Sequence, residues 1–467
     1  MPKVVLPIAN GFYESDSLPI SAQECVNFYP NIAQAPALNQ ETLYGTAGLE
    51  EVANANSLTG NRGAHEMNGV PYFVIAGRLY SMAADFTLTF IGEIAGDTRV
   101  SMADNGTQLL ILVPNGNGYI YNHVADTFAQ ITDSDFTANG NPQLVVYIDG
   151  FFCLTTDSKK FIVSALNDGL SYNALDFGTA ESDPVVFKNQ LFIGGSQTIE
   201  AFQNIGGADF PFQRTGLFLS KGIASPFSIQ SLQGTFVFIG SGQNESPAIW
   251  AFEGNDAVKI STTAIDKELS NLTQDQVTSI YSWGYAEKGA YFVGFALPSS
   301  TLVYDIITKR WHERKSVIEG DLGGYRVTAL VRAYNKIWAG DLVDGRIGNL
   351  DPDFYTEYGT EIRRSIVTQP FQNNMESFVV PEIELTVESG VGNASAPDPQ
   401  IGMARSRNAK TWSDTRFRSI GKVGEYNHRP IWRRNGRAAR FELFRFTMSD
   451  PVKPVIIQMT ADIEGVQ

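Results

Sequence analysis

Short apolar runs separated by turn residues recur along most of the chain. In the first clear unit, Tyr72–Ile75 is followed by the turn residues Ala76 and Gly77 and then by Leu79 and Tyr80. Such run–turn–run units are typical of β-hairpins. Seven units are marked by one central residue each: Phe73, Leu110, Phe152, Phe192, Val237, Phe292 and Trp338. These markers are 37 to 55 residues apart, about 44 on average.

That spacing is typical of propeller blades, which repeat every 40 to 50 residues or so. A blade is a four-stranded meander that buries both of its faces only by packing against its neighbours. We therefore predict a β-propeller-like domain over residues 61–370. A pair of β-sandwiches is the alternative, because their hairpins also recur.

One segment breaks the β pattern. Ser261–Leu269 combines a capping Ser/Thr stretch with apolar residues at helical spacing, and a second such stretch is Asn271–Val277. These stretches predict one or two short helices inserted between blades.

Both flanks differ from the repeat. Residues 1–60 are rich in Pro, Asn and Ala, which predicts an extended N-terminal arm or strap that could bind a partner. Apolar and polar residues alternate over Glu382–Glu388, as in a half-buried strand, and further apolar runs follow up to Val455–Met459. Residues 371–467 are therefore expected to form a separate β-sandwich-type domain.

Composition supports an all-β fold. Aromatic residues make up 12% of the 467 residues, and the chain contains 43 Gly and 21 Pro, as many short strands joined by tight turns require. Cys25 and Cys153 are far apart and are expected to be reduced thiols. No apolar stretch is long enough to cross a membrane and no targeting signal is evident, so we expect a soluble protein made in the cytoplasm without stable membrane insertion.

Charge is distributed unevenly. The net charge of −15 argues against a surface that wraps nucleic acid, yet residues 401–440 contain eleven cations against Asp414 and Glu425. A patch facing an acidic partner, a patch facing DNA, and arginines paired within the chain remain open alternatives. The preference for Arg over Lys favours ion-paired interfaces. The candidate interface residues are Arg405, Arg407, Arg416, Arg418, Arg429, Arg433, Arg434, Arg437 and Arg440.

No catalytic motif is present. The histidines His65, His123, His312 and His428 are widely spaced and lack the spacing of a metal or triad site. No glycine-rich turn has the ending of a phosphate loop. We therefore assign no catalytic, metal or cofactor-binding residues and expect a protein that is not an enzyme.

Several segments, taken in their order along the chain, resemble the tail nozzle family of short-tailed bacteriophages, also called packaged-DNA-stabilisation or tail accessory proteins. The resemblance covers roughly residues 190–467, and it extends more loosely to the N-terminus. The segments are Leu6-Pro7, Val26–Pro30, Lys221–Pro226, Phe236–Ile239, Ile260–Ile265, Leu302–Asp305, Trp311–Arg314, Trp432–Arg437, Phe441–Phe446 and Ser449–Pro451.

This resemblance implies a structural protein of the virion tail. It implies a homo-hexameric ring below the portal-adaptor ring that continues the DNA channel, retains the packaged genome without sequence-specific binding, and carries tail fibres or spikes, together with a tail plug or needle. Two alternatives are a receptor- or glycan-binding propeller and a propeller glycosidase or depolymerase.

Overall fold

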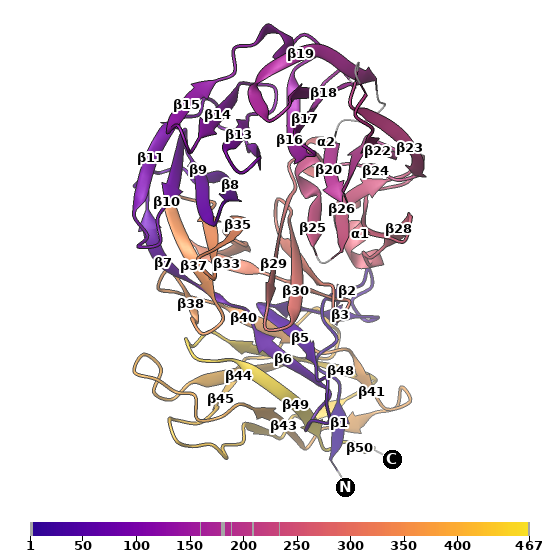
Figure 1. The fold of residues 1–467 in the computed structure, drawn as a ribbon. Coiled ribbons are helices and arrows are strands. Elements are labelled where there is room, and N and C mark those ends of the chain that lie inside the picture. The colour runs from indigo at the N-terminus through magenta and orange to yellow at the C-terminus, as the bar shows by residue number, and fades with distance from the viewer. Residues whose placement is uncertain are drawn as a thin grey trace.

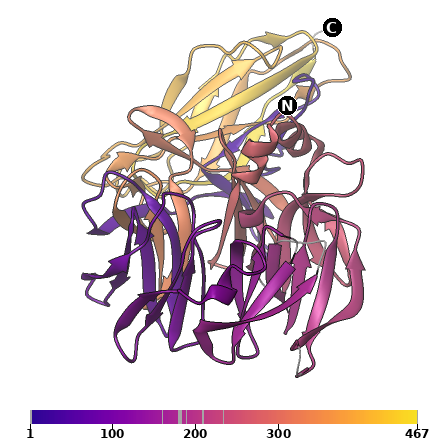
Figure 2. The same cartoon turned by 90° about the horizontal axis from the view of Figure 1, so that it is seen from above.

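The computed structural model describes residues 3–158, 160–178, 183–187, 189–207, 210–232 and 234–465. Strands dominate it, and two short α-helices interrupt them. A ring of blades occupies one half of the molecule and a β-sandwich the other, and both chain termini lie at the sandwich (Figures 1 and 2). This arrangement confirms the all-β class, with a propeller and a C-terminal sandwich.

The first three blades are antiparallel meanders of four consecutive strands. Blade 1 comprises β8 (Asn61–Met67), β9 (Val70–Ile75), β10 (Arg78–Met82) and β11 (Leu88–Glu93). Blade 2 comprises β12 (Ser101–Asp104), β13 (Gln108–Leu112), β14 (Gly118–Asn122) and β15 (Thr127–Gln130). Blade 3 comprises β16 (Pro142–Ile148), β17 (Phe151–Thr156), β18 (Lys160–Ala165) and β19 (Asp168–Gly178).

Blades 4 and 5 continue the ring. Blade 4 comprises β20 (Asp183–Phe187), β21 (Gln190–Gly194), β22 (Ile199–Asn204) and β23 (Phe212–Leu219). Blade 5 comprises β24 (Gly222–Ile223), β25 (Gln230–Leu232), β26 (Thr235–Ser241), β27 (Ala248–Glu253) and β28 (Asp256–Lys259). The helices α1 (Thr263–Ser270) and α2 (Gln274–Thr278) follow it and confirm the predicted helical insertion between blades.

The last two blades tie the ring to the rest of the chain. Blade 6 comprises β29 (Tyr281–Glu287), β30 (Ala290–Ala296), β31 (Thr301–Asp305) and β32 (Arg310–Glu313). Blade 7 comprises β35 (Val327–Ala333), β36 (Lys336–Asp341) and β37 (Arg346–Asp351), and its fourth strand is the N-terminal β7 (Gly48–Asn54). The ring of seven blades in the described residues is thus closed by a strand from the start of the chain.

All seven repeat markers lie in the strand that is second in the spatial order of its blade, from Phe73 in β9 to Trp338 in β36, with Val237 in β26. Runs such as Leu109–Leu112 are buried throughout because each blade is covered by neighbours on both faces. The turns between the first two strands are tight, and Asn68-Gly69 and Asp149-Gly150 both have positive φ. Two residues with positive φ form a type I′ turn, whose twist matches that of the flanking strands.

Residues 1–60, predicted as an extended arm, run through the molecule as short strands. The strand β1 (Val4–Leu6) pairs with β49, and β2 (Tyr13–Glu14) pairs with β3 (Ala22–Gln23). Next, β4 (Cys25–Val26) lies between β32 of blade 6 and β40 of the sandwich, so one sheet of ten strands runs from the propeller into the sandwich. The strands β5 (Phe28–Ile32) and β6 (Glu41–Gly45) belong to the other sandwich sheet.

The sandwich consists of two main sheets. The sheet continuous with blade 6 contains β40 (Arg364–Val367), β41 (Phe371–Gln372), β48 (Phe441–Met448), β44 (Gln400–Ser406) and β45 (Arg416–Ser419). The opposing sheet adds β46 (Ile431–Arg433), β43 (Glu382–Val387) and β49 (Val455–Ala461) to β6, β5 and β1. A small third sheet beside them contains β47 (Arg437–Ala438), β42 (Phe378–Val379) and β50 (Glu464–Gly465). On the propeller side, β38 (Thr356–Glu357) and β39 (Thr360–Glu361) extend the sheet of blade 7 beyond β7, and β33 (Lys315–Ile318) and β34 (Asp321–Gly324) form a hairpin between blades 6 and 7.

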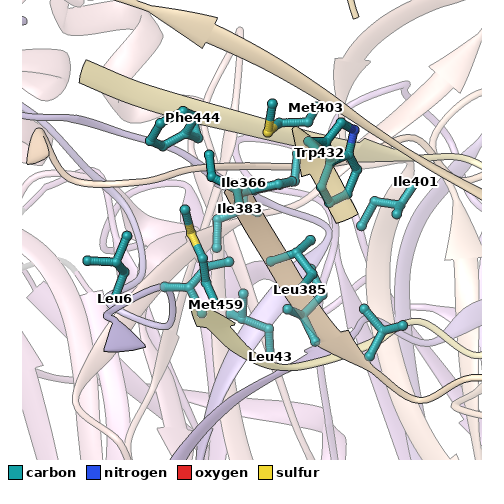
Figure 3. Packing of buried hydrophobic residues seen from close by; sticks show 14 of the residues in the cluster. Leu6, Leu43, Ile366, Ile383, Leu385, Ile401, Met403, Trp432, Phe444 and Met459 are labelled. Atoms are coloured by element: carbon teal, nitrogen blue, oxygen red, sulfur yellow. The ribbon is translucent and has the colours of Figure 1, made fainter. Parts of the chain in front are cut away.

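The sandwich core contains residues from both ends of the chain. Leu6 and Leu43 lie beside Ile383, Trp432 and other buried side chains between the two sheets (Figure 3). The burial of β43 alternates along the strand, as the sequence pattern predicts. The N-terminal segment is therefore part of the sandwich core as well as of the propeller.

Candidate assembly surface

The candidate arginines gather at one edge of the sandwich, which we call the basic edge: Arg405, Arg407, Arg416, Arg418, Arg429, Arg433, Arg434, Arg437 and Arg440. They lie on or next to β44, β45, β46, β47 and β48. The edge strand β45 pairs with β44 on one side, and its side chains reach across to β46 of the opposing sheet. The fold thus brings arginines from a stretch of 36 residues, 405–440, onto one surface.

Two of these arginines close the open edge of the sandwich. Arg416 donates to the backbone oxygen of Arg433 at 3.0 Å and also to the side chain of Asn435, and Arg418 donates to the backbone oxygen of Ile431 at 3.0 Å. Trp432 donates from its indole nitrogen to the backbone oxygen of Arg416 at 2.7 Å. These contacts join β45 to β46 where the two sheets would otherwise separate.

Glu442 is a buried carboxylate below this edge. Its Oε1 accepts a hydrogen bond from Arg405 Nη1 at 3.2 Å and lies 3.9 Å from Arg407 Nε, whereas Oε2 has no partner in the described chain. Burial raises the pKa of Glu442 to about 7, although Arg405 and Arg407 act in the opposite direction. Arg405 and Arg407 are thus tied to the interior of the domain.

A second charge cluster lies on the outer face of β43. Glu384 accepts from Arg429 at 2.5 and 2.6 Å and from Lys3 at 2.6 Å, and Glu382 pairs with Lys3 at 2.7 Å and Arg433 at 2.8 Å. The hydrogen bond from Arg429, with help from Lys3, lowers the pKa of Glu384 to about 2. Two carboxylates therefore hold three cations.

The remaining arginines of the basic edge point outward. Arg437 donates to Ser377 Oγ at 2.7 Å, while Arg434 and Arg440 make no side-chain hydrogen bond or ion pair within the described residues. All three side chains are exposed. Among the exposed arginines of the basic edge, these three therefore have no carboxylate partner within the described residues and can pair with another molecule.

Sequence reasoning missed the carboxylates that hold the inner arginines. Within residues 401–440 it counted Asp414 and Glu425, but Glu382, Glu384 and Glu442 lie outside that window. The alternation over Glu382–Glu388 contained a signal, since it places Glu382 and Glu384 on the same exposed face of one strand. Their pairing with Arg429 and Arg433 depends on strand order, which the sequence pattern does not specify.

The propeller surrounds an axial cavity of about 320 Å³. Arg99, on the connection between blades 1 and 2, crosses it. Its guanidinium lies 4.3 Å from the ring centre of Tyr281 in blade 6, and Nη2 donates to the backbone oxygen of Thr328 in blade 7 at 2.7 Å. Burial lowers the pKa of Arg99 to about 10. Arg99 therefore links three blades across the axis.

The histidines are the other residues in the sequence that could contribute a catalytic or metal site. His65 pairs with Asp104 at 2.7 Å, whereas His312 is fully buried, and burial together with Arg314 keeps its pKa well below the usual range. The described residues contain no group of three side chains suited to a metal ion. Neither Asp nor Glu occurs among the described residues that line the axial cavity, where a propeller glycosidase would need a pair of them.

The two cysteines are free and buried, as expected for reduced thiols. No helix in the described part of the chain is long and apolar enough to cross a membrane.

No curated protein matches the chain. Among solved structures, the chain is similar to the N-terminal domain of Nup159 (TM-score 0.41, 11% identity, 68% of this chain and 97% of that one). It is also similar to the WD40 propeller domain of Doa1 (TM-score 0.39, 12% identity, 65% of this chain and 96% of that one). A third similar structure is BamB from Moraxella catarrhalis (TM-score 0.38, 11% identity, 70% of this chain and 97% of that one).

These TM-scores lie below 0.5, so the assignment rests on family matches. Residues 4–355 match the family described as "Bacteriophage P22 Gp10, beta-propeller", and residues 363–464 match "Bacteriophage P22 Gp10, beta-sandwich". The two matches cover both halves of the fold described above. The chain therefore belongs to the bacteriophage P22 Gp10 family, and it is a phage stabilisation protein and a structural component of the virion tail.

Proposed function

We propose that six copies of this chain form a tail nozzle below the portal-adaptor ring, which continues the DNA channel, helps to retain the packaged genome and carries tail fibres or spikes. The observation that carries this proposal is the family match over both domains. Members of the family are structural and are not known as enzymes. The sixfold number and the adaptor come from the resemblance to the tail nozzle family.

The axial cavity supports a channel made between copies. Its 320 Å³ is the size of a small-ligand pocket, and Arg99 crosses it. The major groove of duplex DNA alone is about 12 Å wide. Because a duplex does not fit through one propeller, a DNA passage requires several chains arranged around it.

The charge of the chain suits such a passage. A net charge of −15 per copy lets carboxylates line the lumen, where they would repel the phosphates and allow the genome to slide. Retention would then depend on closing the channel mechanically, with a plug or needle, and not on adhesion of the DNA to its wall.

The continuous sheet from blade 6 into the sandwich supports a load-bearing role. Strand β4 pairs with β32 on one side and β40 on the other, so the two domains share main-chain hydrogen bonds. A rigid connection of this kind fits a platform that carries fibres outside while packaged DNA presses from inside.

We assign the seam between copies, or between this chain and the adaptor, to the basic edge. Arg434, Arg437 and Arg440 are exposed, and no carboxylate among the described residues pairs with them. Arg416 and Arg418 join β45 to β46 by hydrogen bonds to the backbone of β46, and so hold the strands that carry this surface in place.

Electron-microscope class averages of the full chain, alone and mixed with its adaptor ring, test the proposal. Sixfold rings, or rings that cap the adaptor, are expected. Single propellers that do not bind the adaptor would contradict the nozzle proposal and favour a receptor- or glycan-binding propeller.

A charge-reversal variant tests the seam. Arg434→Glu, Arg437→Glu and Arg440→Glu together should reduce ring formation at least tenfold while leaving the melting temperature within a few degrees of wild type. The matched control is Arg332→Glu with Lys309→Glu, two exposed cations of the propeller. Unchanged rings in the triple variant would remove the basic edge from the seam.

A further inference from the structure

Four aspartates lie along one face of blades 2 and 3, and we call this surface the acidic face: Asp104, Asp126, Asp149 and Asp168. They are placed by the turns β12–β13, β14–β15, β16–β17 and β18–β19, which all lie at the same end of their strands. Hydrogen bonds join these turns: Asn105 bonds Asn167 at 3.3 Å, and His123, in the β14–β15 turn, bonds the backbone oxygen of Gly106 at 3.0 Å. Tyr147, two residues before Asp149, also bonds Asn167, at 2.8 Å. The four carboxylates therefore belong to one surface.

Cations are missing from this part of the sequence. Residues 100–158 contain six Asp and neither Lys nor Arg. Asp126 and Asp149 are exposed, and neither forms an ion pair within the described residues. Asp104 is held by His65, at 2.7 Å. The charge of Asp126 and Asp149 is thus left for another molecule to balance.

Exposed aliphatic side chains accompany these carboxylates. Val124, beside Asp126, is 73% exposed, and Leu166, beside Asp168, is 64% exposed. An interface needs an apolar centre as well as charge, because charged pairs at a rim contribute little affinity alone. The acidic face therefore has both components of a docking surface.

The basic edge has the complementary composition. Its exposed arginines are accompanied by Phe417, which is 57% exposed, and by Tyr426, which is 73% exposed. Blades 2 and 3 lie at the end of the molecule opposite to the sandwich strands β43 and β45 (Figure 1). The two surfaces of one chain therefore do not reach each other, so a contact between them requires two different copies.

We propose that the acidic face of one copy docks onto the basic edge of the next, so that the seam between subunits is formed by two different surfaces. A head-to-tail contact between unlike surfaces generates a ring when its rotation closes. This inference rests on the proposed ring and specifies the partner of the arginines: a second copy of this chain, not the adaptor and not DNA.

A charge-swap experiment tests this pairing. Asp126→Lys with Asp149→Lys should reduce ring formation at least tenfold, as the arginine triple variant does. Both aspartates have positive φ, and so do Lys288 and Lys309 in the corresponding turns of blade 6, so the turns accept lysine. Joining the two sets of changes in one chain should restore ring formation to within twofold of wild type, because the complementarity is re-established with its signs exchanged.

The outcomes separate the two proposals. Wild-type chains that form no ring with or without the adaptor would contradict the nozzle itself. Rings that survive the aspartate change but not the arginine change would overturn only the pairing, and would assign the basic edge to the adaptor. The pairing would also be overturned if the combined variant formed no rings although each set of changes alone gives a folded chain. The control is Glu93→Lys with Glu253→Lys, two exposed acids elsewhere on the propeller, which should leave the rings intact.

Cross-linking gives a second, independent readout. Because Cys25 and Cys153 are buried, new surface cysteines react selectively. A chain carrying Val124→Cys and Arg437→Cys should give a ladder of disulfide-linked oligomers on oxidation of assembled rings. A chain carrying Glu93→Cys and Arg437→Cys should remain monomeric, and equal ladders from both would contradict the pairing.

Discussion

Asn27 joins the two domains through its side chain. Its amide nitrogen donates to the backbone oxygens of Lys315 and Arg363, both at 2.8 Å, and its oxygen accepts from the Lys315 backbone nitrogen at 3.0 Å. The residue is buried and has a φ of 55°, a conformation that asparagine tolerates better than most residues. One side chain thus connects the propeller strand β33 with the start of the sandwich.

Asn27→Asp should destabilise the protein by about 2–4 kcal/mol, because a carboxylate would face two carbonyl oxygens that then lose their donors. The chemical-denaturation midpoint measures this. Asn335→Asp is the control, since Asn335 has a φ of 59° but is exposed, and its effect should stay within about 0.5 kcal/mol. Equal effects of the two changes would show that Asn27 is not a connection between the domains.

Glu357 makes the stability of the same region depend on pH. It is buried in β38, and burial raises its pKa to about 7, although Ser316, Arg326 and Arg364 act in the opposite direction. The unfolded chain releases this proton near pH 4.5, whereas the folded chain keeps it up to about pH 7. The folded state therefore binds more protons within that window, and stability falls as the pH rises through it.

Glu357→Gln should remove this part of the pH dependence, so that the variant gains about 1–3 kcal/mol relative to wild type between pH 5 and pH 8. Unfolding midpoints measured at both pH values provide the comparison. Glu361→Gln, four residues away and exposed beside Arg363, should show no such gain. A constant difference between Glu357→Gln and wild type at both pH values would contradict the assignment.

At the scale of elements, the propeller repeat was predictable and the ring closure was not. Phe73, Leu110 and the other markers lie in second strands because each such strand is buried on both faces and needs a continuous apolar run. Strand β7 reads Gly-Leu-Glu-Glu-Val-Ala-Asn, and three of its seven residues are exposed, so its sequence resembles that of a loop. Its pairing with β37 bridges some 300 residues, which no local pattern encodes.

The same reasoning applies to the candidate surface. The sequence located the basic edge, since eleven cations within 40 residues are visible in any window. It did not separate arginines that hold the fold together from those that face outward. That separation depends on where β43 and β48 place Glu382, Glu384 and Glu442, and strand order is a property of the whole sheet.

At the scale of the whole molecule, two short N-terminal strands connect the propeller to the rest of the chain. Strand β4 fuses blade 6 to the sandwich, and β7 closes blade 7. Both belong to residues 1–60, whose Leu6, Phe28 and Leu43 also lie in the sandwich core. Separating the sandwich from the propeller would therefore require the loss of main-chain pairing to blades 6 and 7.

The charge of the whole chain predicts weak contact with DNA. Binding to duplex DNA depends on cations that displace counterions from phosphates, and it weakens steeply with salt. Here the net charge is −15, and Glu382 and Glu384 hold Arg429, Arg433 and Lys3. We expect the isolated chain to show no salt-dependent binding to a short duplex between 50 and 200 mM salt, as measured by fluorescence anisotropy.

Glu382→Gln with Glu384→Gln provides the positive control for that measurement. It removes two charges and releases three cations on one face, so it should bind the duplex measurably at low salt and lose that binding as salt rises. Tight, salt-sensitive binding by the wild type would contradict a repelling lumen and make the basic edge a DNA contact. If only the variant binds DNA, these two glutamates prevent the cations from forming a patch large enough to bind DNA. The outward arginines Arg434, Arg437 and Arg440 would then be expected to bind a protein partner.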